Sequence, residues 1–211
     1  MTTRENNAQN TDPYDHSNED IPTASTENTY PDWARYSTAA QQYYAEEWGK
    51  PLKDEQDLYE LIALLGFQAG LSWTMILNKR ASLRHHFHDF NPDIVANFGE
   101  DTIQSLLQDE TMIRNRRKIT AAITNAQATV MLRTAGGLVE TIWKYQSESA
   151  EPRESVPELI EANPWIKDLA KELKREGFTQ IGPRLVAALL QAIGMIEPVP
   201  SLRGEVPPRL S

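Results

Sequence analysis

The chain has 211 residues, a net charge of −9 at neutral pH and no cysteine. That length suffices for one domain with a real hydrophobic core, or for a domain with tails. It contains no apolar run of the roughly eighteen residues that a membrane span needs, which excludes a membrane-spanning segment. The lack of cysteine excludes disulfides and thiolate metal sites. Together with an N-terminus that lacks the apolar centre of a signal peptide, it leads us to expect a cytoplasmic protein.

The acidic charge is distributed unevenly along the chain. Residues 1–32 contain one basic and seven acidic residues, a net charge of −6, which leaves −3 for the remainder. Clustering of basic groups on one face governs phosphate binding more than the total charge does. The acidic composition therefore does not exclude nucleic acids as partners.

Composition divides the chain into one central domain, residues 32–197, and two tails. Residues 1–31 are rich in Asn, Thr, Ser, Asp and Glu and poor in large aliphatic side chains, so we expect a disordered acidic tail. Residues 198–211 contain four prolines, which predicts an extended C-terminal tail.

Helical periodicity dominates the central domain, while strand-like alternation is rare, so we predict an all-α fold. The periodicity is clearest in residues 54–68, 101–108, 115–132 and 183–193. A stretch rich in serine and proline, residues 147–157, is typical of a surface loop between two helical halves.

The most informative stretch is residues 67–80, FQAGLSWTMILNKR. Its small residues at positions 69, 70 and 72 let another backbone or a planar ligand approach closely, and Trp73 offers a flat surface. From chemistry alone, a tight helix-to-helix junction with a core tryptophan is the commoner explanation of such a pattern.

Two further segments carry basic residues. Residues 113–119, IRNRRKI, begin a long predicted helix, although a solvated helix face is the usual reason for such a charge run. In residues 173–184, LKREGFTQIGPR, one helix ends before Gly177 and another begins at Pro183. Backbone N–H groups near Gly182 would face a phosphate at that helix N-terminus. The alternative explanation of this pattern is an ordinary turn between two helices that binds no phosphate.

In order and spacing these segments resemble the DNA-3-methyladenine glycosylase I family, from Trp33 to about Ile196. The resemblance implies a helical base-excision repair enzyme with a helix-hairpin-helix element. Such an enzyme flips an alkylated purine of the 3-methyladenine type out of double-stranded DNA and cleaves its N-glycosidic bond without a cofactor. The residues implied for the base pocket are Trp33, Tyr43, Leu65, Phe67 and Trp73. Those implied for DNA binding are Arg114, Arg116, Lys118, Lys174, Gly182 and Arg184.

The chain departs from the family eight positions before Trp73, where the family has a glutamate that hydrogen-bonds the damaged adenine and this chain has Leu65. A lost hydrogen bond to a charged partner predicts a roughly ten- to hundredfold weaker hold on a cationic purine. Because 3-methyladenine in DNA is positively charged and leaves as a neutral base, its release needs no general acid. No catalytic residue is assigned.

The zinc ligands of the family are also missing. The corresponding positions hold Pro31, Tyr44, Val199 and Arg203, which form no credible ligand set. A cluster of three histidines, His85, His86 and His88, lies elsewhere and without cysteine, so we predict no metal site.

These observations favour a monomeric DNA N-glycosylase acting on alkylated double-stranded DNA. Two variants of this hypothesis stay open because of Leu65: a glycosylase with shifted adduct specificity, and a weakened or inactive homologue that binds DNA damage. A helical interaction domain without DNA affinity is poorly supported, given the basic segment and the predicted hairpin.

Overall fold

The computed structural model describes residues 30–31, 33–35, 37–148 and 150–199. The predicted acidic tail (apart from residues 30 and 31) and residues 200–211 of the predicted Pro-rich tail lie outside this range. Throughout the described residues the regular secondary structure is helical, which confirms the all-α prediction. The same part of the chain contains no helix that is both long and apolar enough to cross a membrane.

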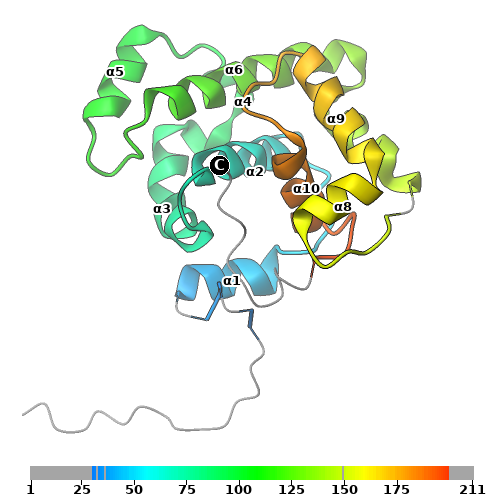
Figure 1. Cartoon of the computed structure of the whole chain (residues 1–211). Coiled ribbons are helices and arrows are strands. Elements are labelled where there is room, and N and C mark those ends of the chain that lie inside the picture. Colours follow the sequence, from blue (N-terminus) through cyan, green and yellow to red (C-terminus); the bar gives the residue numbers. More distant parts are fainter. Residues whose placement is uncertain (1–29, 32, 36, 149, 200–211) are drawn as a thin grey trace, which may run out of the picture.

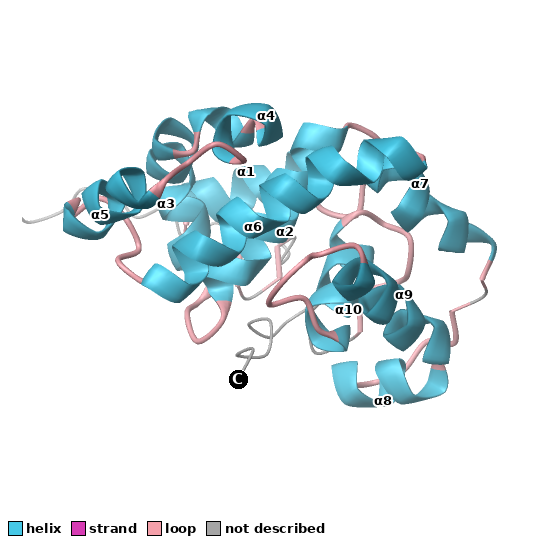
Figure 2. Cartoon of the chain, turned by 90° about the horizontal axis from the view of Figure 1, so that it is seen from above, coloured by secondary structure: helices cyan, strands magenta, loops and turns pink. Residues whose placement is uncertain are grey.

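The core is built around α2 (Glu55–Gln68), which lies at the centre of the molecule (Figures 1 and 2). Asp54 caps this helix by accepting hydrogen bonds from the N–H groups of Gln56 and Asp57, at 2.9 and 3.1 Å. Ten of its fourteen residues are buried, because other helices cover it on several sides. The helix therefore matches the predicted range, residues 54–68, to within one residue.

The other helices form two groups beside α2. One group, seen on the left and below in Figure 1, contains α1, α3 and α5; the other, on the right, contains α8, α9 and α10. The short helix α4 is labelled at the upper centre of Figure 1 and packs against α6. The bounds are α1 Thr38–Glu46, α3 Trp73–His86, α4 Pro92–Val95, α5 Glu100–Gln108, α6 Arg116–Leu132, α7 Gly137–Trp143, α8 Val156–Ala162, α9 Pro164–Arg175 and α10 Pro183–Ala192. Short 3₁₀ turns occupy His88–Phe90, Arg133–Ala135 and Lys144–Ser147.

The long helix α6 packs along α2 and reaches both groups (Figure 2). Asn115 caps its N-terminus through a hydrogen bond from the N–H of Lys118, at 3.2 Å. The hydroxyl of Tyr59 on α2 donates to the carbonyl of Ala122 on α6, at 2.9 Å, which satisfies both groups in the core.

The α9–α10 unit consists of two helices joined by residues 176–182. Gly177 has φ +97°, which only glycine adopts without strain, and α10 begins at Pro183 as predicted. Asn125 of α6 holds the turn: its Oδ1 accepts from the N–H of Thr179 at 2.7 Å, and its Nδ2 donates to the Thr179 carbonyl at 3.3 Å.

The predicted loop at residues 147–157 is shorter in the structure. Ser147 ends a 3₁₀ turn, and α8 begins at Val156 with Ser155 as its N-cap and a proline in its first turn. Proline early in a helix and serine before it are helix-start signals, so the predicted loop overlapped the beginning of a helix.

Candidate nucleic-acid interface and base pocket

Three of the aromatic residues predicted for the base pocket come together in the structure. The ring of Tyr43 lies 6.2 Å from that of Trp33 and 5.4 Å from that of Trp73, measured between centroids, in tilted or edge-to-face contacts. All three side chains are buried, with exposed fractions of 4% or less. Trp48 joins the same cluster at 5.5 Å from Trp33. The rings therefore form a closed aromatic cluster.

Phe67 lies in a different part of the core. Its ring contacts that of Phe87 at 5.7 Å, and Phe87 in turn stacks on Phe90 at 5.2 Å. Among the described residues, Phe67 has no ring contact with the closed aromatic cluster. Its place in a base pocket therefore remains a prediction.

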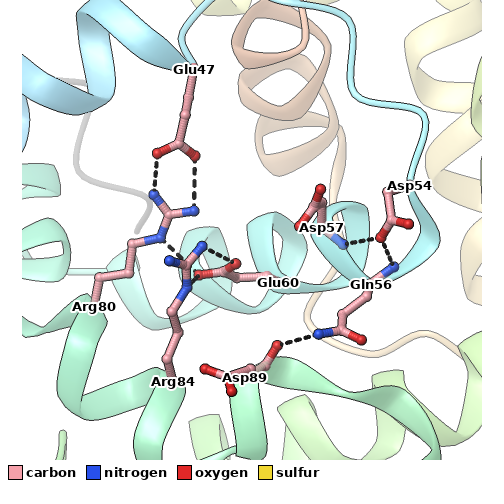
Figure 3. Close-up of polar contacts among 8 residues, drawn as sticks. All are labelled: Glu47, Asp54, Gln56, Asp57, Glu60, Arg80, Arg84 and Asp89. Atoms are coloured by element: carbon pink, nitrogen blue, oxygen red, sulfur yellow. Dashed lines mark hydrogen bonds and ion pairs between the residues drawn. The ribbon is translucent and has the colours of Figure 1, made fainter.

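Four charged side chains, Glu47, Arg80, Glu60 and Arg84, form an ion-pair ladder (Figure 3). Arg80 donates to both carboxylate oxygens of Glu47, at 2.5 and 2.8 Å, and to Glu60 at 2.8 Å. Arg84 donates twice to Glu60, at 2.7 and 2.8 Å. The Arg80 guanidinium also lies 5.9 Å from the Tyr43 ring centroid, so the ladder supports the aromatic cluster.

Electrostatics keep the ladder ionised. Burial by itself would raise the pKa of Glu60, but the hydrogen bonds from Arg84 and Arg80 outweigh burial and hold that pKa below its ordinary value. Burial raises the pKa of the Tyr43 hydroxyl, which stays protonated at neutral pH. The ladder thus connects α1, α2 and α3 through positive and negative side chains that neutralise each other.

The signature turn, residues 68–72, connects α2 to α3. The N–H of Leu71 donates to the carbonyl of Gln68 at 2.6 Å, and Ser72 caps α3 by accepting from the N–H of Met75 at 3.1 Å. Gly70 has φ +78°, so a side chain there would strain the turn. This is the tight helix-to-helix junction that chemistry alone favoured, and Trp73 begins the second helix.

Two polar groups of this segment have no hydrogen-bond partner within the described part of the chain. They are Nε2 of Gln68 and Nε1 of Trp73, on side chains that are 1% and 2% exposed. Most buried polar groups in proteins are paired, and an unpaired buried donor costs about 1–3 kcal/mol. The core beside the signature turn therefore contains two hydrogen-bond donors without a partner among the described residues.

An open cavity of about 920 Å³ lies between the signature turn, the start of α6 and the α9–α10 turn. Its lining includes four of the six predicted DNA-binding residues, Lys118, Lys174, Gly182 and Arg184. Of the five residues predicted for the base pocket, Leu65 lines this cavity and the four aromatic residues do not. The structure therefore brings residues from distant parts of the chain onto one basic surface. Glu161 is the one carboxylate in this lining.

The two remaining DNA-binding predictions, Arg114 and Arg116, are exposed but do not line the cavity. Arg116 is paired with Glu100 through two hydrogen bonds of 3.0 and 2.8 Å. Its charge is therefore partly neutralised within the protein.

The cavity also contains basic residues that the sequence prediction omitted, Arg117 and Lys167. Arg117 belongs to the same charge run as Lys118, so the sequence could have identified it as a DNA-binding candidate. Lys167 precedes Lys174 by seven residues, two helical turns, which places both on one face of α9. That spacing was the signal that could have revealed Lys167.

The positions of the family's zinc ligands hold apolar and aromatic groups here. Pro31 is buried, Tyr44 makes an edge contact with Trp33 at 5.8 Å, and Val199 is 2% exposed. These side chains offer no nitrogen or sulfur ligand and do not fit zinc, while Arg203 lies outside the described residues. Within the described ranges, no group of three His, Cys, Asp or Glu side chains is placed to hold a metal ion.

A helical body with a basic cavity facing an αα-turn is an arrangement typical of nucleic-acid-binding proteins. Residues 33–199 match the methyladenine glycosylase family, and the chain belongs to this family. It is 36% identical over 161 residues to the DNA-3-methyladenine glycosylase of Haemophilus influenzae, covering 74% of this chain and 85% of the relative. It is 35% identical over 157 residues to DNA-3-methyladenine glycosylase 1 of Escherichia coli, covering 73% and 84%.

Solved structures agree with the sequence relatives. A crystal structure of 3-methyladenine DNA glycosylase I superposes with a TM-score of 0.71 at 33% identity, covering 80% of this chain and 94% of the other. A structure of the Staphylococcus aureus enzyme that addresses 3-methyladenine recognition superposes with a TM-score of 0.69 at 28% identity, covering 81% and 96%. The family assignment therefore extends to the fold.

Proposed function

We propose that this protein is a base-excision DNA repair glycosylase that removes an alkylated purine of the 3-methyladenine type from double-stranded DNA. The observation that carries the proposal is the shared cavity, whose lining includes both Leu65, beside the signature turn, and Gly182 of the α9–α10 turn. Family membership supplies the reaction class, and the cavity supplies a surface on which DNA backbone and extruded base meet.

The basic residues of the cavity would hold the DNA backbone. We take the α9–α10 unit to be a helix-hairpin-helix element, in which the N–H groups at the start of α10 meet a phosphate and Lys174 adds a positive charge. Phosphate contacts fix the position of a protein on DNA without reading sequence. This suits an enzyme that searches for damage in any sequence.

The extruded base would be received at the Leu65 end of the cavity. A purine outside the duplex loses its stacking, and each aromatic face that replaces it contributes about 1–3 kcal/mol. Tyr43 and Trp73 contact each other in the closed aromatic cluster and do not line this cavity, so the base would first meet Leu65. The buried Nε2 of Gln68 and Nε1 of Trp73, which have no partner within the described residues, would donate to its ring nitrogens once the base has entered.

The reaction is hydrolysis of the N-glycosidic bond. The bond between C1′ of the deoxyribose and the purine breaks with its electron pair passing to the positively charged base, which leaves neutral. Water adds to C1′ and loses a proton, so an abasic site remains. We propose a monomeric, cytoplasmic enzyme that needs no cofactor for this step.

The decisive experiment incubates the purified protein with methylated duplex DNA and identifies any released base by mass. Wild type is expected to release 3-methyladenine. Leu65→Glu should hold the cationic base more tightly, and Leu65→Met is the matched apolar control, expected to behave like wild type. The proposal fails for the natural protein if it releases no base while Leu65→Glu does.

A second candidate function follows from Leu65 itself, which cannot make a directional hydrogen bond to the base. It is a homologue that binds damaged DNA without turnover. Tight binding to a duplex with an abasic site, together with no base release over hours, would favour this candidate and reject the glycosylase.

A third outcome would refine the reaction rather than reject it. Release of a bulkier or uncharged adduct in preference to 3-methyladenine would indicate a shifted specificity. The same mass measurement distinguishes this outcome when the substrate DNA carries several adducts.

A further inference from the structure

Lys118 joins the first turn of α6 to the end of α2. Its ammonium donates a hydrogen bond to the carbonyl of Phe67 at 2.7 Å and another to the carbonyl of Ala69 at 2.6 Å. Carbonyls at a helix C-terminus lack partners inside the helix, and a cation there also interacts favourably with the helix dipole. Lys118 thereby fixes the backbone on both sides of Gln68, where the signature turn begins.

The same segment of α6 also holds the α9–α10 turn. The Arg117 carbonyl accepts a hydrogen bond from Nε2 of Gln180 at 2.8 Å, and Asn125 binds the backbone of Thr179. Gln180 has φ +53°, a conformation that costs free energy for any residue with a side chain. Its bond to α6 stabilises this strained turn, so α6 connects the two turns that face the cavity.

Lys118 differs from the other cations of the cavity. It is half-buried, whereas Arg117 and Lys174 are exposed. Burial lowers the pKa of the Lys118 ammonium. Two of its three hydrogens are occupied by the carbonyls of α2, which leaves one for water or a phosphate oxygen. A lysine that only contacts phosphate at the surface would not need to be half-buried or bonded to two backbone carbonyls.

We propose that Lys118 is a positioning residue that sets the signature turn at a fixed distance from the α9–α10 turn. A base extruded from DNA held at the α9–α10 turn then meets Leu65 and Trp73 in a single geometry. A displacement of about 1 Å at a reacting centre can cost about a hundredfold in rate, so a small movement of the turn is sufficient. The catalytic consequence rests on the proposed function, whereas the clamp itself does not.

The kinetic test compares Lys118→Met, Lys118→Arg and Arg117→Met in single-turnover base release from methylated DNA at saturating protein. Arginine keeps the charge, but its planar guanidinium cannot take the place of a compact ammonium between two carbonyls. Both Lys118 variants should therefore lose about ten- to a hundredfold in rate. Lys118→Arg should retain its affinity for undamaged duplex within about twofold, as expected when the charge is kept.

Arg117→Met is the matched comparison, because it removes a neighbouring charge that makes no clamp. Its main loss should be in DNA affinity, with the slope of log affinity against log salt reduced by about one. The proposal is overturned if Lys118→Arg keeps the wild-type rate, or if Lys118→Met loses only affinity in the manner of Arg117→Met.

A second measurement does not depend on catalysis. Hydrogen exchange of the Leu71 amide, which is bonded to the Gln68 carbonyl at 2.6 Å, reports the closure of the signature turn. Exchange should be at least about tenfold faster in both Lys118 variants and unchanged in Arg117→Met. Unchanged Leu71 exchange in the Lys118 variants rejects the clamp even if the wild type releases base. Faster exchange in a protein that releases no base supports the clamp and rejects the glycosylase.

Discussion

The two regions on either side of α2 use the same types of charged residue in opposite ways. Towards α1 and α3, Arg80 and Arg84 are matched by the carboxylates of the ion-pair ladder. Towards α9, Arg117, Lys167 and Lys174 have no carboxylate partner within the described part of the chain. The comparison indicates which cations hold the fold together and which are left for a ligand of opposite charge.

The largest effect should come from breaking the ladder. Arg80→Met leaves Glu47 without its bidentate partner and leaves Glu60 with Arg84 alone. Removing one partner of a buried ion pair costs about 3–5 kcal/mol, because a charge stays buried and uncompensated. Since Arg84 remains, we expect the free energy of unfolding to fall by about 3 kcal/mol in urea titrations.

A surface ion pair provides the control for this substitution. Arg133 pairs with Asp93 and Glu55 in a more exposed setting, and Arg133→Met should cost less than Arg80→Met. Equal losses for the two variants would show that burial adds nothing to the ladder. The ladder would then differ from the surface ion pair in its position and not in its contribution to stability.

The ladder should also make stability depend on acid. The pKa of Glu60 is lower in the folded protein than its ordinary value of about 4.3, so its stabilising contribution is complete above that pH. The contribution is lost as pH falls through the folded-state pKa. The difference in unfolding free energy between wild type and Glu60→Gln should therefore shrink between neutral pH and strongly acidic pH. A difference that stays constant over that range would contradict the assignment.

On the other side of α2, substitution should affect DNA binding and leave stability almost unchanged. Lys174→Gln removes an exposed cavity cation, so we expect about tenfold weaker binding to duplex DNA and a salt slope reduced by about one. Lys171→Gln is the matched control, because Lys171 lies on the same helix, is 75% exposed and pairs with Asp168 outside the cavity lining. Similar losses in both variants would mean that the cavity is not the DNA surface.

The sequence predicted the long helices better than the short ones. Residues 54–68 and 115–132 carry several turns of apolar periodicity and begin at Asp54 and Asn115, which are strong N-caps. By contrast, α4 and α8 have four and seven residues, two turns or fewer, and periodicity over such a span is weak. The predicted loop at residues 147–157 therefore extended over the first two residues of α8, whose start was marked only by Ser155 and the proline in its first turn.

The site was only partly accessible to sequence reasoning. The resemblance identified Tyr43 and Trp73, and the structure places their rings in contact. The ladder was missed because its four side chains come from three separate segments that meet only on folding. The position of Lys118 was missed for another reason: its acceptors are backbone carbonyls, which leave no pattern of residue types along the chain.

The smallest effect on DNA binding should come from Arg116, which the sequence grouped with the other basic residues. Both of its terminal nitrogens donate to Glu100, so a phosphate would have to displace a carboxylate to reach it. Exposed ion pairs are weak, but Arg116 also lies outside the cavity lining. We expect Arg116→Gln to change duplex affinity by no more than about twofold, with Glu100→Gln as the reciprocal control. A loss as large as that of Lys174→Gln would mean that a DNA phosphate displaces Glu100 from Arg116. The DNA surface would then extend past the cavity along the start of α6.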